Sequence, residues 1–194
     1  MSIFEFWLEN DWVIKILGIA LLVVLVMVLE KFYQYFVSFQ RLKELRAMKN
    51  LKDIDSLKAG VMRQSLEDIA SFEGSSETLF NANVGVKLDL YEQYMMRSVS
   101  FIGLVAVLAP MIGLIGTFIG VWHVFGGVGD SGLNDPAIIA RGIKEVLIDT
   151  MAGLVVAVIA MVFYKMFEHI SVKVVSLFEE KLYELIRDSH AQIS

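Results

Sequence analysis

The sequence contains no cysteine, which excludes a disulfide framework, a thiolate metal site and a cysteine nucleophile. It has only three histidines, His123, His169 and His190, and they lie far apart, so a histidine-built metal site within one chain is not expected. The formal net charge of −5 leaves no basic balance to favour nucleic acid. No nucleophile and base occur at a catalytic spacing, so we expect neither an enzyme nor a bound cofactor or metal.

Apolar residues, by contrast, are abundant. Of the 194 residues, 56% are hydrophobic, and the mean hydropathy is +0.62. Soluble domains contain roughly 45–50% apolar residues. Three apolar stretches, 13–36, 99–124 and 138–165, reach the roughly 20 residues that a helix needs to cross a bilayer. The sequence therefore predicts an all-α integral membrane protein with three transmembrane helices. The first stretch has a short uncharged core, and a buried soluble helix is its alternative.

The charges on the two sides of the first span differ in sign. Acidic residues precede it, at Glu5, Glu9 and Asp11. Basic residues follow it, at Arg41, Lys43, Arg46, Lys49 and Lys52. Cytoplasmic flanks of membrane helices are rich in lysine and arginine, so we expect the N-terminus outside and the C-terminus in the cytoplasm. The basic segment marks topology or contacts membrane lipids.

This topology assigns each segment outside the spans to one side of the membrane. The expected segments are a short periplasmic N-terminus (1–12), a cytoplasmic helical domain (37–98), a periplasmic hairpin (125–137) and a cytoplasmic C-terminal helix (166–194). In the cytoplasmic domain, residues 73–77 favour a turn in which Ser75 or Ser76 caps a helix. From Thr78 onward the helical pattern continues, and we expect one unbroken helix into the second span. The cytoplasmic C-terminal helix is amphipathic.

The second span carries one proline and a row of glycines. Pro110 removes a helix hydrogen bond and predicts a kink. Gly113, Gly116 and Gly120 stand at i, i+3 and i+7, so they share a face on which another helix can approach closely. Phosphate-binding glycines are the alternative, but neither basic residues nor a strand accompany them. The glycine-rich hairpin that follows ends at Pro136, which is typical of a first helical position.

The third span contains ionisable residues. Arg141, Glu145 and Asp149 stand at i, i+4 and i+8, on one slowly drifting helical stripe. Arg141 can pair with Glu145 near the membrane surface, while Asp149 lies a turn deeper. An unpaired charge on the lipid face costs about 2.5–3.5 kcal/mol even on lenient scales. We therefore expect these side chains to face a pore or a partner.

A stripe of small residues follows in the same span, at Thr150, Gly153, Ala157 and Ala160. It could line a narrow passage, or it could pack against another helix with the Thr150 hydroxyl bonded back to its own backbone. Thr117 places a second hydroxyl in the neighbouring span. Ionisable groups inside membranes are often parts of proton pathways, which favours the first interpretation.

Two motifs resemble a known family. They are Ala-Pro-Met-Ile-Gly-Leu-Ile-Gly-Thr-Phe-Ile-Gly (109–120) and Gly-Ile-Lys-Glu-Val-Leu-Ile-Asp-Thr-Met-Ala-Gly-Leu-Val-Val-Ala (142–157). Both are similar to motifs of the MotA/TolQ/ExbB proton-channel family, in its ExbB/TolQ branch. The order of the motifs, the three spans and the basic segment after the first span agree with that branch. The short N-terminus leans slightly towards a TolQ-like role.

The resemblance implies a homopentamer in the bacterial inner membrane. Its second and third spans would surround two single-span helices similar to ExbD or TolR, and an aspartate of those helices would take up protons. A TonB- or TolA-like protein would carry the resulting force to the outer membrane. By motif matching, Thr117 and Thr150 would be pore hydroxyls and Glu145 would stand at the pore entrance. Pro110, Gly153, Ala157 and the second-span glycines would shape the pore or pack helices.

The sequence departs from the family pattern at three positions. Ile159 replaces a proline, Lys144 replaces a small residue, and Asp149 adds a carboxylate. Asp149 would face either the pore or a subunit interface. The expected function is a subunit that uses the proton-motive force, with protons as the coupling ion. A membrane scaffold that assembles partners without conducting is the alternative.

Overall fold

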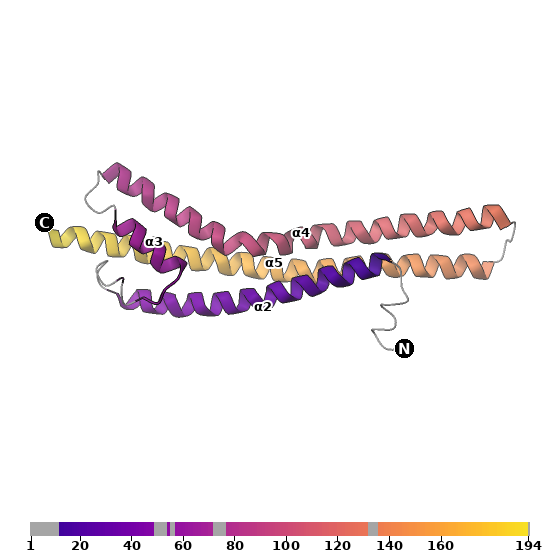
Figure 1. Cartoon of the computed structure of the whole chain (residues 1–194), viewed down its shortest axis with the longest axis horizontal. Helices are drawn as coiled ribbons and strands as arrows, with labels where there is room; N and C mark the ends of the chain where they lie inside the picture. The colour runs from indigo at the N-terminus through magenta and orange to yellow at the C-terminus, as the bar shows by residue number, and fades with distance from the viewer. Residues whose placement is uncertain (1–11, 49–53, 55–56, 72–76, 132–135, 194) are drawn as a thin grey trace. The chain divides into compact units, whose positions relative to one another are not determined.

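The structure, a computed structural model, describes residues 12–48, 54, 57–71, 77–131 and 136–193. Its helices are α2 (Trp12–Ala47), α3 (Val61–Ala70), α4 (Glu77–Ser131) and α5 (Pro136–Ile193) (Figure 1). These residues contain no strand, so the all-α prediction is confirmed for the described part. The predicted cap at Ser75 or Ser76 lies outside the described residues.

Helix α4 is one continuous helix of 55 residues. At about 1.5 Å per residue it is roughly 80 Å long, well beyond the roughly 30 Å of a hydrocarbon core. The expectation that the chain continues as one helix from Thr78 into the second span is therefore confirmed. Pro110 stands inside this helix.

The connection after α4 is shorter than the predicted hairpin of residues 125–137. Residues 125–131 continue α4, and α5 begins at Pro136. Each glycine costs a helix only about 1 kcal/mol, so a glycine-rich stretch without a proline does not have to end one. Pro136 is the first residue of α5, as predicted.

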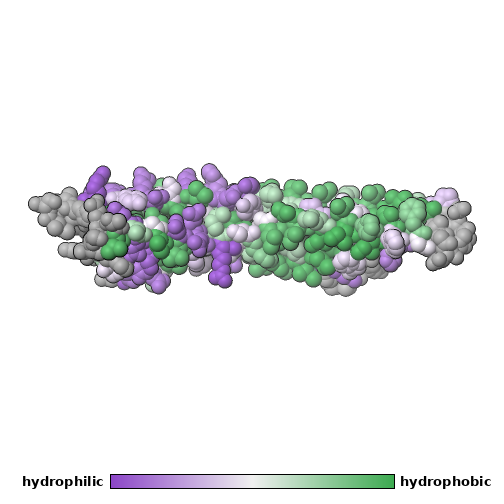
Figure 2. Space-filling view, turned by 90° about the horizontal axis from the view of Figure 1, so that it is seen from above, coloured by the Kyte–Doolittle hydropathy of each residue, from purple (hydrophilic) through white to green (hydrophobic). Residues whose placement is uncertain are grey.

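The three-span prediction is met by length and composition. Helical segments Trp12–Ala47, Leu79–Gly126 and Gly142–Asp188 are long and apolar enough to cross a membrane. Only 22%, 28% and 33% of their most apolar windows are buried inside the chain. Most of this apolar surface must therefore face lipid or other chains. Figure 2 shows hydrophobic side chains gathered over one part of the visible surface.

The chain forms two compact units. One consists of described residues up to Val28 together with 100–165, and we call it the apolar unit. The other consists of described residues within 29–99 and from Met166 onward, and we call it the amphipathic unit. Each unit combines parts of α2, α4 and α5.

In the apolar unit, small residues bring helices α4 and α5 into close contact. A Cβ atom added at Gly153 would lie 2.7 Å from the Ala109 carbonyl oxygen and 3.2 Å from the Gly113 Cα atom. These are backbone atoms, so the two helices touch where neither has a side chain. Around this contact lies a core cluster of Val13, Leu17, Ala109, Val156 and Ala157.

In the amphipathic unit, buried side chains from all of its helices pack together. The phenol oxygen of Tyr35 lies 2.6 Å from Ser171 Oγ and 3.1 Å from the Phe167 carbonyl oxygen. The rings of Tyr91 and Phe178 pack with centroids 4.9 Å apart. These contacts join α2 and α4 to α5 within this unit.

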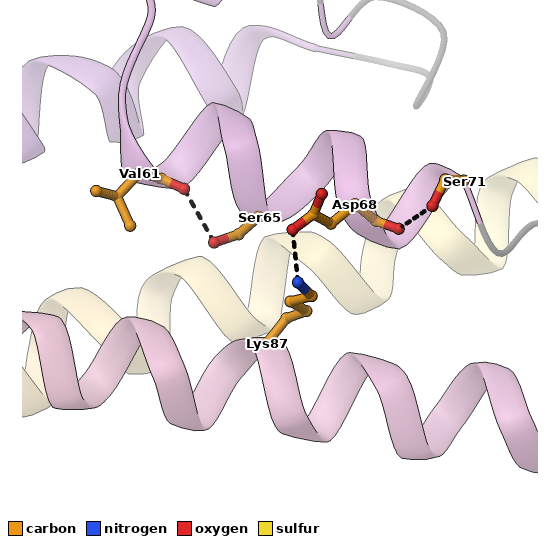
Figure 3. A network of polar contacts seen from close by, with 5 residues as sticks. All are labelled: Val61, Ser65, Asp68, Ser71 and Lys87. Atoms are coloured by element: carbon orange, nitrogen blue, oxygen red, sulfur yellow. Dashed lines mark hydrogen bonds and ion pairs between the residues drawn. The ribbon is translucent and has the colours of Figure 1, made fainter.

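The short helix α3 packs through one apolar face and is fixed by polar contacts. Met62, Leu66 and Ile69 are buried. Figure 3 shows Lys87 reaching from α4 to Asp68 of α3, where Nζ and Oδ2 are 2.5 Å apart. The ion pair is partly exposed, so its contribution to stability is about 1 kcal/mol or less. The buried apolar face must therefore supply most of the binding of α3.

The close approach at Gly153 can be tested by substitution. Gly153→Ala places a methyl group against the backbone of α4, so α4 and α5 would have to move apart. We expect the free energy of unfolding to fall by about 1–3 kcal/mol. Gly85→Ala is the matched control, because a Cβ atom there meets nothing within 4 Å. Thermal unfolding of the purified protein in detergent should show a lower midpoint for Gly153→Ala alone. Equal midpoints for both variants would contradict the close contact.

Candidate functional site

Asp149 of α5 lies inside the apolar unit and is only 4% exposed. A Cβ atom added at Gly116 of α4 would lie 3.0 Å from Asp149 Oδ2 and 3.0 Å from both methyl carbons of Val13. The carboxylate therefore occupies the space that Gly116 leaves free, beside the first turn of α2. Within one chain, Asp149 faces the chain's own helix packing.

Thr150, the next residue, has a buried hydroxyl. Its Oγ1 atom forms no hydrogen bond with any described residue. The alternative in which this hydroxyl bonds back to its own helix is therefore wrong for this structure. A buried hydroxyl without a partner costs about 1–3 kcal/mol. A water molecule or a group from another chain would remove that cost.

Thr117 of α4 uses its hydroxyl differently. Its Oγ1 atom donates a hydrogen bond to the Leu114 carbonyl oxygen at 2.6 Å, within the same helix. The residues around it, Leu114, Ile115 and Phe118, are exposed. Thr117 and Thr150 thus make no hydrogen bond to each other. Of these two threonines, only Thr150 has a hydroxyl without a hydrogen-bond partner among the described residues.

The predicted ion pair of Arg141 and Glu145 falls on side chains outside the described part of the structure. Both residues belong to α5, and their pairing stays a prediction. Lys144, which lies between Arg141 and Glu145 in the sequence, is exposed. Among the described residues, no group of three histidine, cysteine, aspartate or glutamate residues could hold a metal ion.

The glycine row of α4 faces α5 within one chain. Gly113 lies against the backbone at Thr150 and Gly153, Gly116 lies against Asp149, and Gly120 lies against the Val146 side chain. Ala157 is also buried, at 8% exposure. These residues therefore hold the two helices together and bring Asp149 and Thr150 to the α4 contact.

Val13 of α2 also belongs to the site, although no pattern in the sequence indicates it. Its side chain is 1% exposed, and it lies over the same Gly116 position as Asp149. The first span was interpreted only as a membrane helix, and one valine in an apolar run carries no signal that would single it out. Helix α2 therefore contributes a wall to the surroundings of the buried carboxylate.

The packing of Asp149 on Gly116 predicts energetic coupling between the two residues. Gly116→Ala should lower the free energy of unfolding by about 1–3 kcal/mol, because the new methyl group meets the Asp149 carboxylate and Val13. The same substitution should cost less when Asp149→Ala has already removed the carboxylate. A double-mutant cycle measured by thermal unfolding gives this coupling directly. An equal cost of Gly116→Ala in both backgrounds would show that the carboxylate lies elsewhere.

The chain is similar in sequence to several known proteins. Over 189 aligned residues the chain is 25% identical to the biopolymer transport protein ExbB of Salmonella typhimurium, covering 86% of this chain and 78% of the relative. It is 41% identical over 71 residues to ExbB of Neisseria gonorrhoeae, covering 37% of this chain and 31% of the relative. An ExbB homolog of Methanothermobacter thermautotrophicus is 44% identical over 70 residues, covering 36% of this chain and 24% of the relative.

A family model also matches this chain. Residues 53–180 match the model of the MotA/TolQ/ExbB proton channel family, which covers more than half of the chain. With three helices able to cross a bilayer, the chain is a multi-pass membrane protein. The chain belongs to the MotA/TolQ/ExbB proton channel family.

Proposed function

We propose that this chain is the channel-forming subunit of an inner-membrane complex that uses the proton-motive force to drive a TonB-type system. Family membership and the similarity to biopolymer transport proteins support this role. The relatives named here are ExbB proteins, so we favour an ExbB-like role over the TolQ-like role that the short N-terminus suggested. In this proposal the chain catalyses no chemical reaction and needs no cofactor, and protons are the coupling ion.

The observation that carries the proposal is the pair formed by Thr150 and Asp149. A carboxylate and an unpartnered hydroxyl lie buried on adjacent residues of an apolar span. Intramembrane polar groups are costly, and they persist where they serve ion or proton movement. Thr150 can hold a water molecule, because a hydroxyl both donates and accepts hydrogen bonds. A chain of such groups is what a proton requires to pass through hydrocarbon.

The other site residues take supporting parts in this proposal. Glu145 gathers protons near the entrance, and Thr117 adds a second hydroxyl on the α4 side. Asp149 sets the electrostatics beside Thr150 while Gly116 and Val13 hold it in place. The proton itself passes to a carboxylate of an ExbD-like single-span partner, because the apolar unit offers few oxygen ligands of its own.

Assembly completes the proposed channel. The apolar windows of the spans are mostly exposed in one chain, as they would be if further chains or lipid covered them. We propose a homopentamer around two ExbD-like helices, which transmit force to a TonB-like protein. A non-conducting scaffold is the second candidate, and the tight glycine packing of α4 on α5 favours it because that packing stabilises a fold without needing a pore.

Proton flux separates the two candidates. We expect Thr150→Val, which keeps the side-chain shape but removes the hydroxyl, to lower flux through the complex about tenfold, as the loss of one hydrogen-bonding group implies. Thr150→Ser keeps the hydroxyl and is the matched control, for which flux should stay near that of the unsubstituted complex. Flux is measured in liposomes that contain the complex purified with its single-span partner.

The integrity of the complex decides how the result is interpreted. Co-purification of the partner shows that each variant still assembles. An assembled Thr150→Val complex that conducts at the unsubstituted rate would remove Thr150 from the pathway. An assembled, unsubstituted complex that conducts no better than empty liposomes would favour the scaffold.

A further inference from the structure

A cavity of about 560 Å³ lies within the amphipathic unit, between α2, α4 and the start of α3. Its walls carry three basic side chains, those of Lys31, Arg41 and Arg97, and one carboxylate, that of Glu30. The volume is in the range of small-molecule binding sites. The excess of positive charge in its walls favours an anion over a cation.

The basic residues of this cavity form no ion pair with another described residue. Lys31 is 1% exposed, and its Nζ atom donates to the Met95 carbonyl oxygen at 2.8 Å and to Gln34 Oε1 at 2.7 Å. Both acceptors are uncharged, and within the described residues no carboxylate lies at ion-pair distance from Lys31 or Arg97. The Glu30 carboxylate offsets part of the Lys31 charge without forming an ion pair, and burying the remaining charge is costly. A bound anion would offset that cost.

Arg41 also lines this cavity, and its guanidinium group has an unused donor. Its Nη2 atom donates to the Ala59 carbonyl oxygen at 2.8 Å, while its buried Nε atom has no hydrogen-bond partner among the described residues. Gly60 makes room for this arrangement, because a Cβ atom there would overlap the guanidinium group. Arginine offers several donors in one plane, which suits the oxygens of a phosphate group.

The first turn of α3 adds backbone donors to the wall. Val61 and Met62 line the cavity, and α3 has no side-chain cap at its N-terminus. The first N–H groups of a helix have no partner in the helix, and they carry partial positive charge. They therefore add to the attraction of the basic side chains for an anion.

The position of the cavity in the sequence matches the level of lipid headgroups. Glu30 and Lys31 directly follow the uncharged core of the first span, and Arg97 directly precedes the uncharged stretch of the second. The basic residues after the first span predict the cytoplasmic side. Basic pockets between membrane helices on that side bind anionic headgroups.

We propose that this cavity binds the phosphate headgroup of an anionic phospholipid of the cytoplasmic leaflet. The headgroup phosphate accepts hydrogen bonds from Arg41 and Arg97 and neutralises Lys31. The acyl chains of this lipid lie outside the cavity, in the hydrocarbon layer of the membrane. The bound lipid would fasten α3 and the ends of both spans to the membrane surface, a role independent of proton conduction.

Lipid retention tests the proposal on the full-length protein. The purified chain in micelles is exposed to phosphatidylglycerol or to phosphatidylcholine, and native mass spectrometry counts the lipid that each chain retains. We expect Arg97→Gln and Arg41→Gln each to weaken phosphatidylglycerol binding about fivefold. Arg46→Gln is the matched control, because Arg46 is exposed on α2 and does not line the cavity.

Several results would overturn the proposal. Equal retention of both lipids would show that the headgroup charge is not recognised. An equal loss in Arg46→Gln would indicate diffuse attraction to basic residues. Displacement of the lipid by millimolar inorganic phosphate would assign the cavity to a soluble phosphate compound. Arg97 is exposed and forms no ion pair in the described part, so Arg97→Gln should fold even if Arg41→Gln does not.

Discussion

A membrane helix must keep its charged and polar groups away from lipid, and this constraint governs the apolar unit. Asp149 meets it by occupying the space beside Gly116, under Val13. Because Gly113 and Gly153 let α4 and α5 touch at backbone level, the carboxylate and the neighbouring Thr150 are enclosed by protein on the side of α4. The glycine row thus does more than pack two helices. It creates the place in which a buried carboxylate can persist.

Much of this arrangement follows from the sequence. Hydropathy and length indicated the three spans, and the spacing of Gly113, Gly116 and Gly120 indicated a face for close packing. The sequence could not tell whether Asp149 faces a pore, a neighbour or its own chain, because residues on one helix stripe can meet several partners. The buried Lys31 was also unforeseen, since a lysine that follows an apolar run usually reaches water. Here neutral acceptors on α2 and α4 hold its ammonium group inside the protein.

The two units carry different kinds of polar burial. In the apolar unit, few polar groups are buried, and Thr150 keeps its hydroxyl unused. In the amphipathic unit, Tyr35, Ser171 and Lys31 are buried with hydrogen bonds that join helices. Hydrogen bonds that join helices make a rigid support, whereas an unused hydroxyl can exchange partners. The amphipathic unit also contains buried polar atoms without a partner among the described residues, at Arg41 Nε, Glu44 Oε2 and Asn83 Nδ2.

We propose that the chain conducts protons only together with a single-span partner that supplies the titrating carboxylate. The most direct measurement is proton flux into liposomes under an imposed pH gradient, with the complex carrying either the partner's native membrane aspartate or an asparagine in its place. We expect proton flux from the native complex, and flux near that of empty liposomes from the complex with the asparagine. Equal flux from both complexes, each shown to be intact, would contradict it.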